Sequence, residues 1–168
     1  MEDTNIEAIE LYEPHIGEMN VPGDHNRWNA ALVAELGRQV GISDDVIEEG
    51  IAAFHGTWRR LELKGKTSEG AIVYDDYGHH PTEVRVTLEA LKEKYPGKKI
   101  VCVFQPHQHS RTKEFLSEFG TCFQAADYVI IPNIYASRDS EEDMKSMTTE
   151  MLVEEIKKYH SSVCNGKD

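Results

Sequence analysis

One segment decides the fold, and it reads Ile72-Val-Tyr-Asp-Asp-Tyr-Gly-His-His-Pro-Thr-Glu-Val84. An apolar run ends in acids, a glycine and two histidines, and Pro81 then opens an apolar-periodic stretch. This pattern predicts a buried strand, a sharp polar loop and a helix with Pro81 and Glu83 in its first turn. Ligands of open α/β sheets bind at the carboxyl ends of strands. The candidate site residues here are therefore Asp75, Asp76, Tyr77, His79 and His80. The alternative is a strand-to-helix turn with polar capping residues.

A second segment of the same type follows a second apolar run. Residues 100–104 form the predicted strand, and Gln105-Pro-His-Gln-His-Ser-Arg111 follows it. Neighbouring parallel strands end at the same edge of a sheet. We therefore expect Asp76, His107 and Arg111 to line a common pocket that faces the first fifty or so residues.

The remaining elements alternate regularly. Strands are expected at 71–75, 99–104 and 127–132, and helices at 82–95, 111–124 and 148–159. Such alternation predicts an α/β fold with a Rossmann-like, mostly parallel sheet. Residues 61–74 are expected to form a β-hairpin, residues 133–147 a polar loop, and no strand is expected after residue 160. Two helices are expected before residue 55, the second capped by Ser43.

Composition narrows the possible functions. A chain of 168 residues holds one domain, or one domain and part of another. Its net charge of -12 argues against a nucleic-acid or anionic-membrane surface. No apolar run reaches the length of a membrane span, and the acidic start is not a signal peptide. The three cysteines have no paired or C-x-x-C spacing, and two of them fall in or beside apolar segments, which indicates buried thiols and a cytoplasmic location.

The tripeptide Gly65-Lys66-Thr67 resembles the end of a phosphate-binding loop. The full pattern requires a glycine at position 60 and a helix after the threonine. Position 60 is arginine, and a strand is expected after Thr67. We interpret the tripeptide as a hairpin turn.

Four motifs in order resemble the C-terminal part of the Mur ligases. They are Gly23-x-His25-Asn26-x-x-Asn29-Ala30, Gly56-x-x-Arg59-Arg60-x-Glu62, Asp76-Tyr-Gly-His-His-Pro81 and Phe104-Gln-Pro-His-x-x-Ser-Arg-Thr112. The resemblance implies that residues 1–55 are the helical end of a central ATP-binding domain. It also implies that residues 56–168 are a C-terminal Rossmann-like domain without its last strands.

The branch that the motifs resemble most joins L-alanine to UDP-N-acetylmuramate in peptidoglycan biosynthesis. The resemblance implies an ATP-dependent ligase that forms an acyl phosphate, with ATP and Mg2+ required. The phosphate loop and metal ligands are expected in ligase domains outside this chain, so the chain is expected to be inactive alone and to bind no metal itself. The implied ATP-binding residues are His25, Asn26, Asn29, Arg60 and Asp76. For Asn26 the alternative is a helix cap.

The resemblance also places residues near the incoming amino acid: Tyr77, His79, His107 and Arg111. Arg111 suits the alanine carboxylate through a bidentate pair, and His79 or His107 is the candidate catalytic base. His80 is expected to serve structure more than function. Position 108 is glutamine, whereas the family often has arginine there. Recognition of the alanine carboxylate is therefore expected to differ in detail from that in the family.

Three alternatives remain open. The first is the related ligase that reattaches a recycled tripeptide to the same sugar. The second is a zinc site built on His79-His80 and His107-x-His109. The third is a non-catalytic α/β binding module that uses the loop 133–147, with Tyr135 and Arg138.

Overall fold

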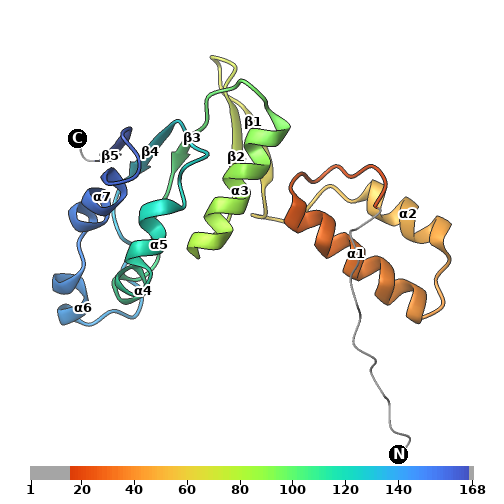
Figure 1. The fold of residues 1–168 in the computed structure, drawn as a ribbon, viewed down its shortest axis with the longest axis horizontal. Helices are drawn as coiled ribbons and strands as arrows, with labels where there is room; N and C mark the ends of the chain where they lie inside the picture. The colour runs from red at the N-terminus through yellow and green to blue at the C-terminus, as the bar shows by residue number, and fades with distance from the viewer. Residues whose placement is uncertain (1–15, 167–168) are drawn as a thin grey trace, which may run out of the picture. The chain divides into compact units, whose positions relative to one another are not determined.

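The computed structural model describes residues 16–166 and divides into two compact units, Met1–Gly56 and Thr57–Asp168. Figure 1 shows the elements of both units. The first unit is a pair of helices, α1 (Asp24–Gln39) and α2 (Asp44–Ala53). Ala30, Ala34 and Ile47 are buried between them. A Cβ on Gly37 would lie 2.9 Å from the Ile47 side chain, so the absence of a side chain there permits the close approach.

The second unit begins with the predicted hairpin. Strand β1 (Glu62–Lys66) pairs antiparallel with β2 (Ile72–Asp75), and the register shifts by one residue between Leu63 and Gly65. The Gly65-Lys66-Thr67 tripeptide therefore lies at the end of β1 and the start of the turn, where Thr67 N–H donates to the Ala71 carbonyl. The interpretation as a hairpin is confirmed.

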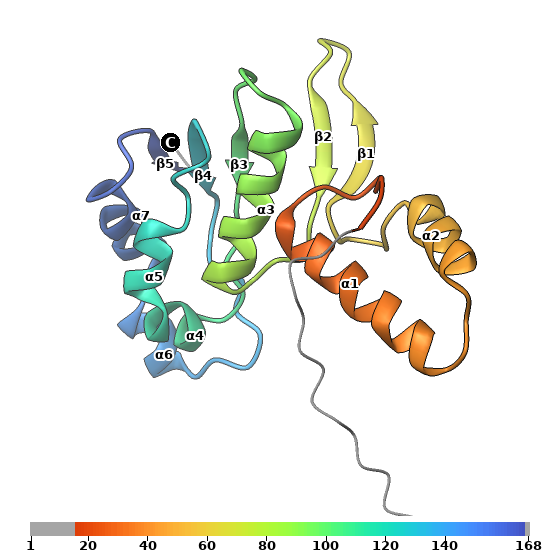
Figure 2. The ribbon, with the colours of Figure 1, turned by 45° about the vertical axis from the view of Figure 1, so that its right-hand side comes forward.

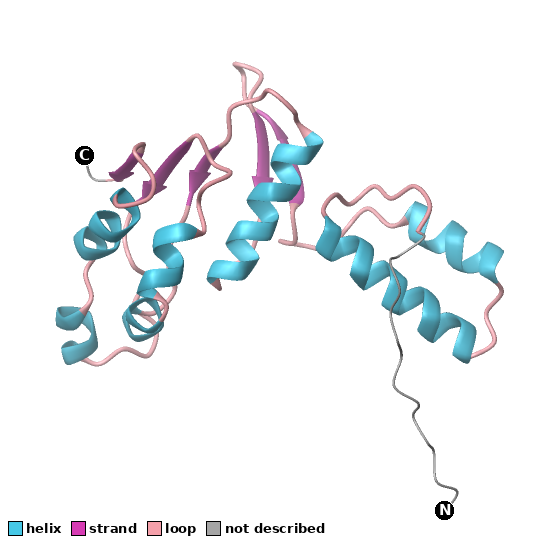
Figure 3. Ribbon diagram, viewed as in Figure 1, coloured by secondary structure: helices cyan, strands magenta, loops and turns pink. Residues whose placement is uncertain are grey.

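A parallel sheet of three strands forms the other part of this unit, in the order β3 (Val101–Val103), β4 (Tyr128–Ile131) and β5 (Val163–Asn165). Five helices alternate with the strands: α3 (Pro81–Lys94), α4 (His109–Glu114), α5 (Leu116–Thr121), α6 (Glu141–Ser146) and α7 (Thr149–Lys157). Figure 3 shows α5 and α7 on one side of this sheet. The core between them contains Phe104, Phe119, Phe123, Leu152 and Ile156. The expected α/β class with a parallel sheet is confirmed.

Three expectations about the elements were wrong. A strand does follow residue 160, because β5 pairs with Val129–Ile131 of β4. The helix expected at 111–124 is two helices that meet at Phe115, whose backbone (φ −102°, ψ 23°) leaves the helical region. The loop 133–147 contains a helix, α6, which Ser140 and Asp143 begin with a capping box.

Asp127, just before β4, joins α3, β3 and β4. Its Oδ2 accepts hydrogen bonds from the Ile100 amide at 2.8 Å and from Lys92 Nζ of α3 at 3.0 Å. These two donors, the amide first, lower the pKa of Asp127. The starts of β3 and β4 and the end of α3 are thereby held by one carboxylate.

None of the helices in residues 16–166 is long and apolar enough to cross a membrane.

Candidate functional site

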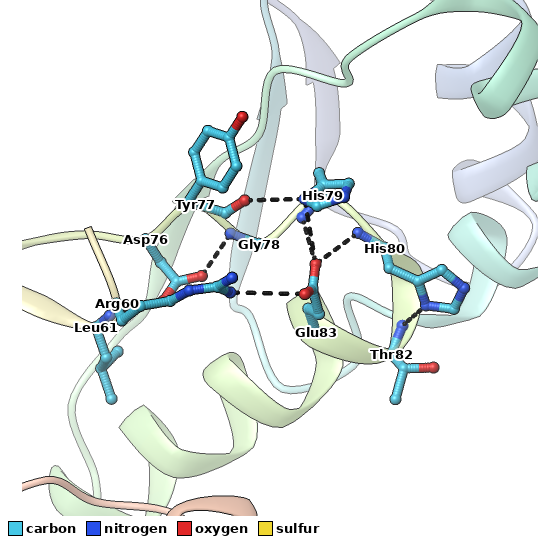
Figure 4. A network of polar contacts seen from close by, with 9 residues as sticks. All are labelled: Arg60, Leu61, Asp76, Tyr77, Gly78, His79, His80, Thr82 and Glu83. Carbon is cyan, nitrogen blue, oxygen red and sulfur yellow. Dashed lines mark hydrogen bonds and ion pairs between the residues drawn. The ribbon is translucent and has the colours of Figure 1, made fainter. Parts of the chain in front are cut away.

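The loop after β2 is held by the first turn of α3. His80 is the N-cap, with Nδ1 accepting from the Thr82 amide at 3.2 Å, and Pro81 follows at N1. Glu83 accepts from the amides of His79 and His80 at 2.9 and 3.0 Å. Figure 4 shows these contacts around Glu83. The bonds satisfy main-chain donors that a helix start leaves without partners, so the loop has a fixed conformation.

Glu83 also links two candidate site residues. Its Oε1 lies 3.5 Å from Nη1 of Arg60, and its Oε2 lies 3.4 Å from Nδ1 of His79. Partial burial opposes ionisation of Glu83, but the hydrogen bonds from the two histidine amides, helped by the charges of His79 and Arg60, outweigh it and lower its pKa. The resemblance assigns Arg60 to ATP and His79 to the amino acid, and in the structure both side chains contact the carboxylate of Glu83.

The carboxylate of Asp76 accepts hydrogen bonds from two backbone amides. One carboxylate oxygen accepts from the Leu61 amide and the other from the Gly78 amide, both at 2.7 Å. A Cβ on residue 78 would lie 2.7 Å from Asp76 Oδ1, so a side chain there would displace this carboxylate oxygen. A carboxylate has about four acceptor positions. Asp76 therefore organises the loop and still has capacity to accept a hydroxyl.

Tyr77 lies on the outside of this loop. Its ring lies under the guanidinium of Arg59, 4.9 Å from the ring centroid, and meets the His79 ring edge-on at 5.6 Å. Arg59 also pairs with Asp75 at 3.3 Å. Arg59 and Asp75 thus support the position of Tyr77.

The loop after β3 is tied to the loop after β4. The ring of His107 stacks on that of Tyr135 at 5.3 Å. The Tyr135 amide donates to the Pro106 carbonyl at 2.8 Å, and the Gln108 amide donates to the Tyr135 carbonyl at 2.9 Å. Gln105 and Asn133 add a side-chain hydrogen bond at 2.9 Å. The β3–β4 pairing therefore continues past the strand ends and places His107.

Gln108 adopts a backbone conformation that non-glycine residues rarely take. Its φ is 75° and its ψ is 131°, and it is the N-cap of α4. Its carbonyl accepts from the Thr112 hydroxyl at 2.7 Å as well as from the Thr112 amide. These bonds keep the strained residue in place at the position where the sequence departs from the family.

Asp139, from the loop before α6, holds the start of α4. Its carboxylate accepts from the amides of His109 and Ser110 at 3.0 and 3.1 Å and from the Ser110 hydroxyl at 3.0 Å. Desolvation opposes ionisation of Asp139, but these hydrogen bonds lower its pKa overall. Arg111 lies on the same helix, half-buried, and within residues 16–166 its guanidinium forms no ion pair.

The loop after β2 contacts the junction of α4 and α5 through one ring pair. His80 packs edge-on against Phe115 with 4.7 Å between ring centroids, which agrees with a structural role for His80. A groove that includes Asp76 among its lining residues is not lined by His107 or Arg111. The convergence of Asp76, His107 and Arg111 in one pocket stays a prediction.

The three candidate residues of the first unit lie in the first turns of α1. His25 and Asn26 are half-buried and Asn29 is exposed. Asn26 is not the helix cap that the alternative interpretation supposed. Gly23 is the N-cap, with φ of 99°, and Asn26 Nδ2 donates to the Pro22 carbonyl at 2.7 Å.

The structure gives no support to the zinc alternative. Nδ1 of His109 is 2.6 Å from the Met147 carbonyl, a contact that fixes the ring in the fold. Within residues 16–166, no group of three or more His, Cys, Asp or Glu side chains is placed to hold a metal ion.

Sequence reasoning underestimated two acids. Glu83 was assigned only to the first helical turn, although a glutamate three residues after a cap is the signal of a capping box. Asp139 was not singled out, and no local pattern could have found it, because its donors lie about thirty residues away in the sequence.

Comparison with known proteins identifies relatives of this chain. Residues 59–167 match the family described as "Mur ligase, glutamate ligase domain". The UDP-N-acetylmuramate–L-alanine ligase of Trichlorobacter lovleyi is 42% identical over 146 residues, which are 86% of this chain and 31% of that protein. The enzyme of the same name from Caldanaerobacter subterraneus subsp. tengcongensis is 44% identical over 151 residues, or 90% and 32% of the two chains.

A solved structure agrees with these relatives. The UDP-N-acetylmuramate-alanine ligase of Thermotoga maritima superposes with a TM-score of 0.68 and 29% identity, covering 86% of this chain and 30% of that one. The chain therefore spans about a third of the length of the relatives that it matches.

Proposed function

The chain belongs to the Mur ligase family, and from this premise we propose that it is the C-terminal part of an ATP-dependent UDP-N-acetylmuramate–L-alanine ligase of peptidoglycan precursor synthesis. The names of the relatives above support the choice of L-alanine as the amino acid. The isolated chain is inactive in this proposal, since residues 16–166 present neither a phosphate loop nor a group of metal ligands.

The proposal rests mainly on the surroundings of the Arg111 side chain. In a chain of net charge -12, its half-buried guanidinium forms no ion pair within residues 16–166. The helix that bears it is held by Asp139. A positioned arginine without an acidic partner suits a carboxylate that arrives with a substrate, because its planar fork donates two parallel hydrogen bonds.

The proposed reaction has two steps. The carboxylate of UDP-N-acetylmuramate first takes the γ-phosphoryl group of ATP, which gives an acyl phosphate and ADP. The amine of L-alanine then attacks the acyl carbon, the C–N bond forms, the C–O bond to phosphate breaks, and inorganic phosphate leaves. The amine must lose a proton, and His79 or His107 receives it. Binding of the amine beside the acyl carbon makes the second step effectively intramolecular.

The other candidate residues serve the nucleotide in this proposal. Arg60, held by Glu83, meets phosphate or ribose oxygens, and Asp76 accepts a ribose hydroxyl with its remaining acceptor capacity. His25, Asn26 and Asn29 contact the adenine, because asparagine can donate and accept at one edge of the base. Mg2+ would neutralise charge on the phosphates, and its ligands are assigned to other parts of a full-length ligase.

The test places this chain in a complete enzyme. The 146 matched residues of the Trichlorobacter lovleyi ligase are replaced by those of this chain, and phosphate release is measured with ATP and UDP-N-acetylmuramate. We expect activity with L-alanine and much less with the tripeptide L-Ala-γ-D-Glu-meso-diaminopimelate. Preference for the tripeptide would overturn the choice of substrate, and phosphate release by the isolated chain would overturn its inactivity.

Two variants of the chimera test the residue roles. Arg111→Ala should raise the KM for L-alanine by about 10- to 100-fold, from the loss of a charge-assisted pair, with the KM for ATP unchanged. Asp76→Ala should raise the KM for ATP instead. Arg85→Ala, an exposed arginine of α3, is the control. An equal effect of all three substitutions would contradict the proposed roles.

A further inference from the structure

The imidazole of His79 is held from one side by two hydrogen-bond acceptors. Its Nδ1 lies 3.3 Å from the Tyr77 carbonyl oxygen and 3.4 Å from Oε2 of Glu83, and Figure 4 shows both contacts. Carbonyl and carboxylate oxygens can only accept a hydrogen bond, so Nδ1 carries the proton of the neutral ring. The Tyr77 ring also meets the His79 ring edge-on, with 5.6 Å between the centroids. These contacts fix the orientation and the tautomer of His79 together.

The other ring nitrogen of His79 is open. With the proton on Nδ1, Nε2 has a free lone pair. Within residues 16–166 Nε2 takes part in no hydrogen bond or ion pair, and the side chain is 36% exposed. Nε2 can therefore accept a proton from a ligand that reaches the loop after β2.

The neighbouring histidine has the opposite tautomer. Nδ1 of His80 accepts from the Thr82 amide at 3.2 Å, so this nitrogen carries no proton and Nε2 must carry it. The ring of His80 also packs against Phe115. His80 is therefore a hydrogen-bond donor at Nε2 and is excluded as a base, although it is adjacent to His79 in the sequence.

His107 lacks a partner that would set its tautomer. It follows β3 as His79 follows β2, and Figure 2 shows the arrowheads of these two strands pointing the same way, so both loops leave their strands at the same end. The ring of His107 stacks on Tyr135, but within residues 16–166 its nitrogens form no hydrogen bond or ion pair. Of the two candidate bases, only His79 has a proton-accepting nitrogen that the fold determines.

We propose that His79 is the catalytic base of the ligase reaction and that its Nε2 takes the proton of the incoming amino group. This inference rests on the function proposed above and replaces a choice between two histidines with one atom. Glu83 and the Tyr77 carbonyl orient the ring, in the way that a carboxylate orients the histidine base of other enzymes. His107 contacts the amino acid without accepting its proton.

Two protons leave the amino group when the amide forms. Nε2 takes one from the ammonium of L-alanine, which frees the electron pair that attacks the acyl carbon. The C–N bond forms, the C–O bond to phosphate breaks, and the phosphate takes the second proton. The resulting imidazolium lies 3.4 Å from the Glu83 carboxylate, which stabilises its charge until Nε2 returns the proton to water. The lowered pKa of Glu83 keeps this carboxylate ionised at neutral pH.

The tautomer can be measured in the 168-residue chain itself. Long-range proton–nitrogen NMR correlations at about pH 8.5, where an ordinary imidazole is neutral, distinguish protonated from unprotonated ring nitrogens. We expect the proton on Nδ1 of His79 and on Nε2 of His80, with the signals assigned from His79→Gln and His80→Gln. A proton on Nε2 of His79 would overturn the proposal, because that atom could not then accept another.

The catalytic role can be measured in the chimera described above with two nucleophiles. L-alanine enters as an ammonium, whereas hydroxylamine is largely neutral at pH 7 and traps an acyl phosphate as the hydroxamate without a base. His79→Gln should lower kcat with L-alanine by about 100- to 10,000-fold. The same variant should leave hydroxamate formation and the KM for ATP nearly unchanged. Added imidazole should restore part of the activity with L-alanine to His79→Ala.

Matched variants separate the causes of a loss. His55→Gln changes an exposed histidine and should leave both rates unchanged. His107→Gln should raise the KM for L-alanine more than it lowers kcat. Equal loss of both products in His79→Gln would assign His79 to the fold or to acyl phosphate formation and overturn the proposal. The split between nucleophiles in His107→Gln instead would assign the base to His107.

The chimera also separates this inference from the function on which it rests. Failure of the unmodified chimera to ligate L-alanine would overturn the proposed function. Full activity of His79→Gln in a chimera that does ligate L-alanine would overturn only the assignment of the base.

Discussion

The carboxylate of Glu83 lies 3.5 Å from the guanidinium of Arg60 and at the same time accepts hydrogen bonds from the backbone of the loop that carries His79. One side chain thus fixes the start of α3 and the place of two proposed substrate-binding residues. A substitution of Glu83 should therefore lower the stability of the fold directly, and any loss of activity should accompany that loss of stability.

Glu83→Ala should lower the free energy of unfolding at pH 7 by about 1 kcal/mol, the usual cost of a lost helix cap. Thermal unfolding by circular dichroism measures the change. Glu89→Ala, an exposed glutamate on the same helix, should have almost no effect. Equal losses for both variants would mean that the capping box contributes nothing.

The same variant should change the pH dependence of stability. The pKa of Glu83 is lowered in the folded state. Its contribution to the free energy of unfolding is therefore fully present above about pH 4.3, the ordinary pKa of glutamate. This contribution is lost as the pH falls through the lower pKa of the folded state. The melting temperatures of the parent chain and Glu83→Ala should differ at pH 7 and converge towards pH 3. A difference that stays constant down to pH 3 would show that the carboxylate charge is not involved.

Asp139→Ala should release the start of α4. We expect a loss of about 1 to 2 kcal/mol in stability and faster exchange at the amides of His109 and Ser110, which donate to this carboxylate. Glu142→Ala, an exposed acid in α6, is the control. Unchanged exchange at both amides would contradict the role of Asp139.

Gln108→Gly should stabilise the chain. The φ of 75° strains glutamine but not glycine, and the relief should outweigh the greater freedom of glycine in the unfolded state by roughly 1 kcal/mol. Gln124→Gly, in a turn without positive φ, should destabilise slightly. Chemical denaturation distinguishes the two directions, and a destabilised Gln108→Gly would show that the strain is not real.

The three thiols should react at very different rates. Burial raises the pKa of Cys102 to about 12 and also raises that of Cys122, whereas Cys164 is exposed. Because the thiolate is the reactive form, Cys164 should react first with a thiol reagent at pH 8. Cys164→Ser should remove that fast phase and leave two thiols that react on unfolding. Rapid reaction of a second thiol in the folded Cys164→Ser variant would contradict the burial.

The elements with local signals were predictable from the sequence. The strand, loop and helix of the β2–α3 unit follow from Ile72, Val73 and Pro81, because a β-branched run and a helix-start proline act on their own neighbours. The expectation that this strand is buried was wrong, since Ile72 and Val73 are 38% and 40% exposed. The resemblance to the Mur ligases rested on motifs of the same local kind, and the comparisons confirm it.

The remaining features depend on contacts between distant residues. Strand β5 has three residues, and its pairing with β4 makes it a strand. The break at Phe115 coincides with the packing of its ring on His80. Both oxygens of Asp76 accept from backbone amides, which residue type alone does not indicate.

The link that Asp127 makes among α3, β3 and β4 has a kinetic consequence. The bond between Ile100 and Asp127 closes a shorter loop than the pairing of Val129 with Val163, which brings β5 onto β4, because the two pairs are 27 and 34 positions apart. We expect this region to be structured in the folding transition state and β5 to be added later. Asp127→Ala should then slow folding, whereas a substitution in β5 should mainly accelerate unfolding.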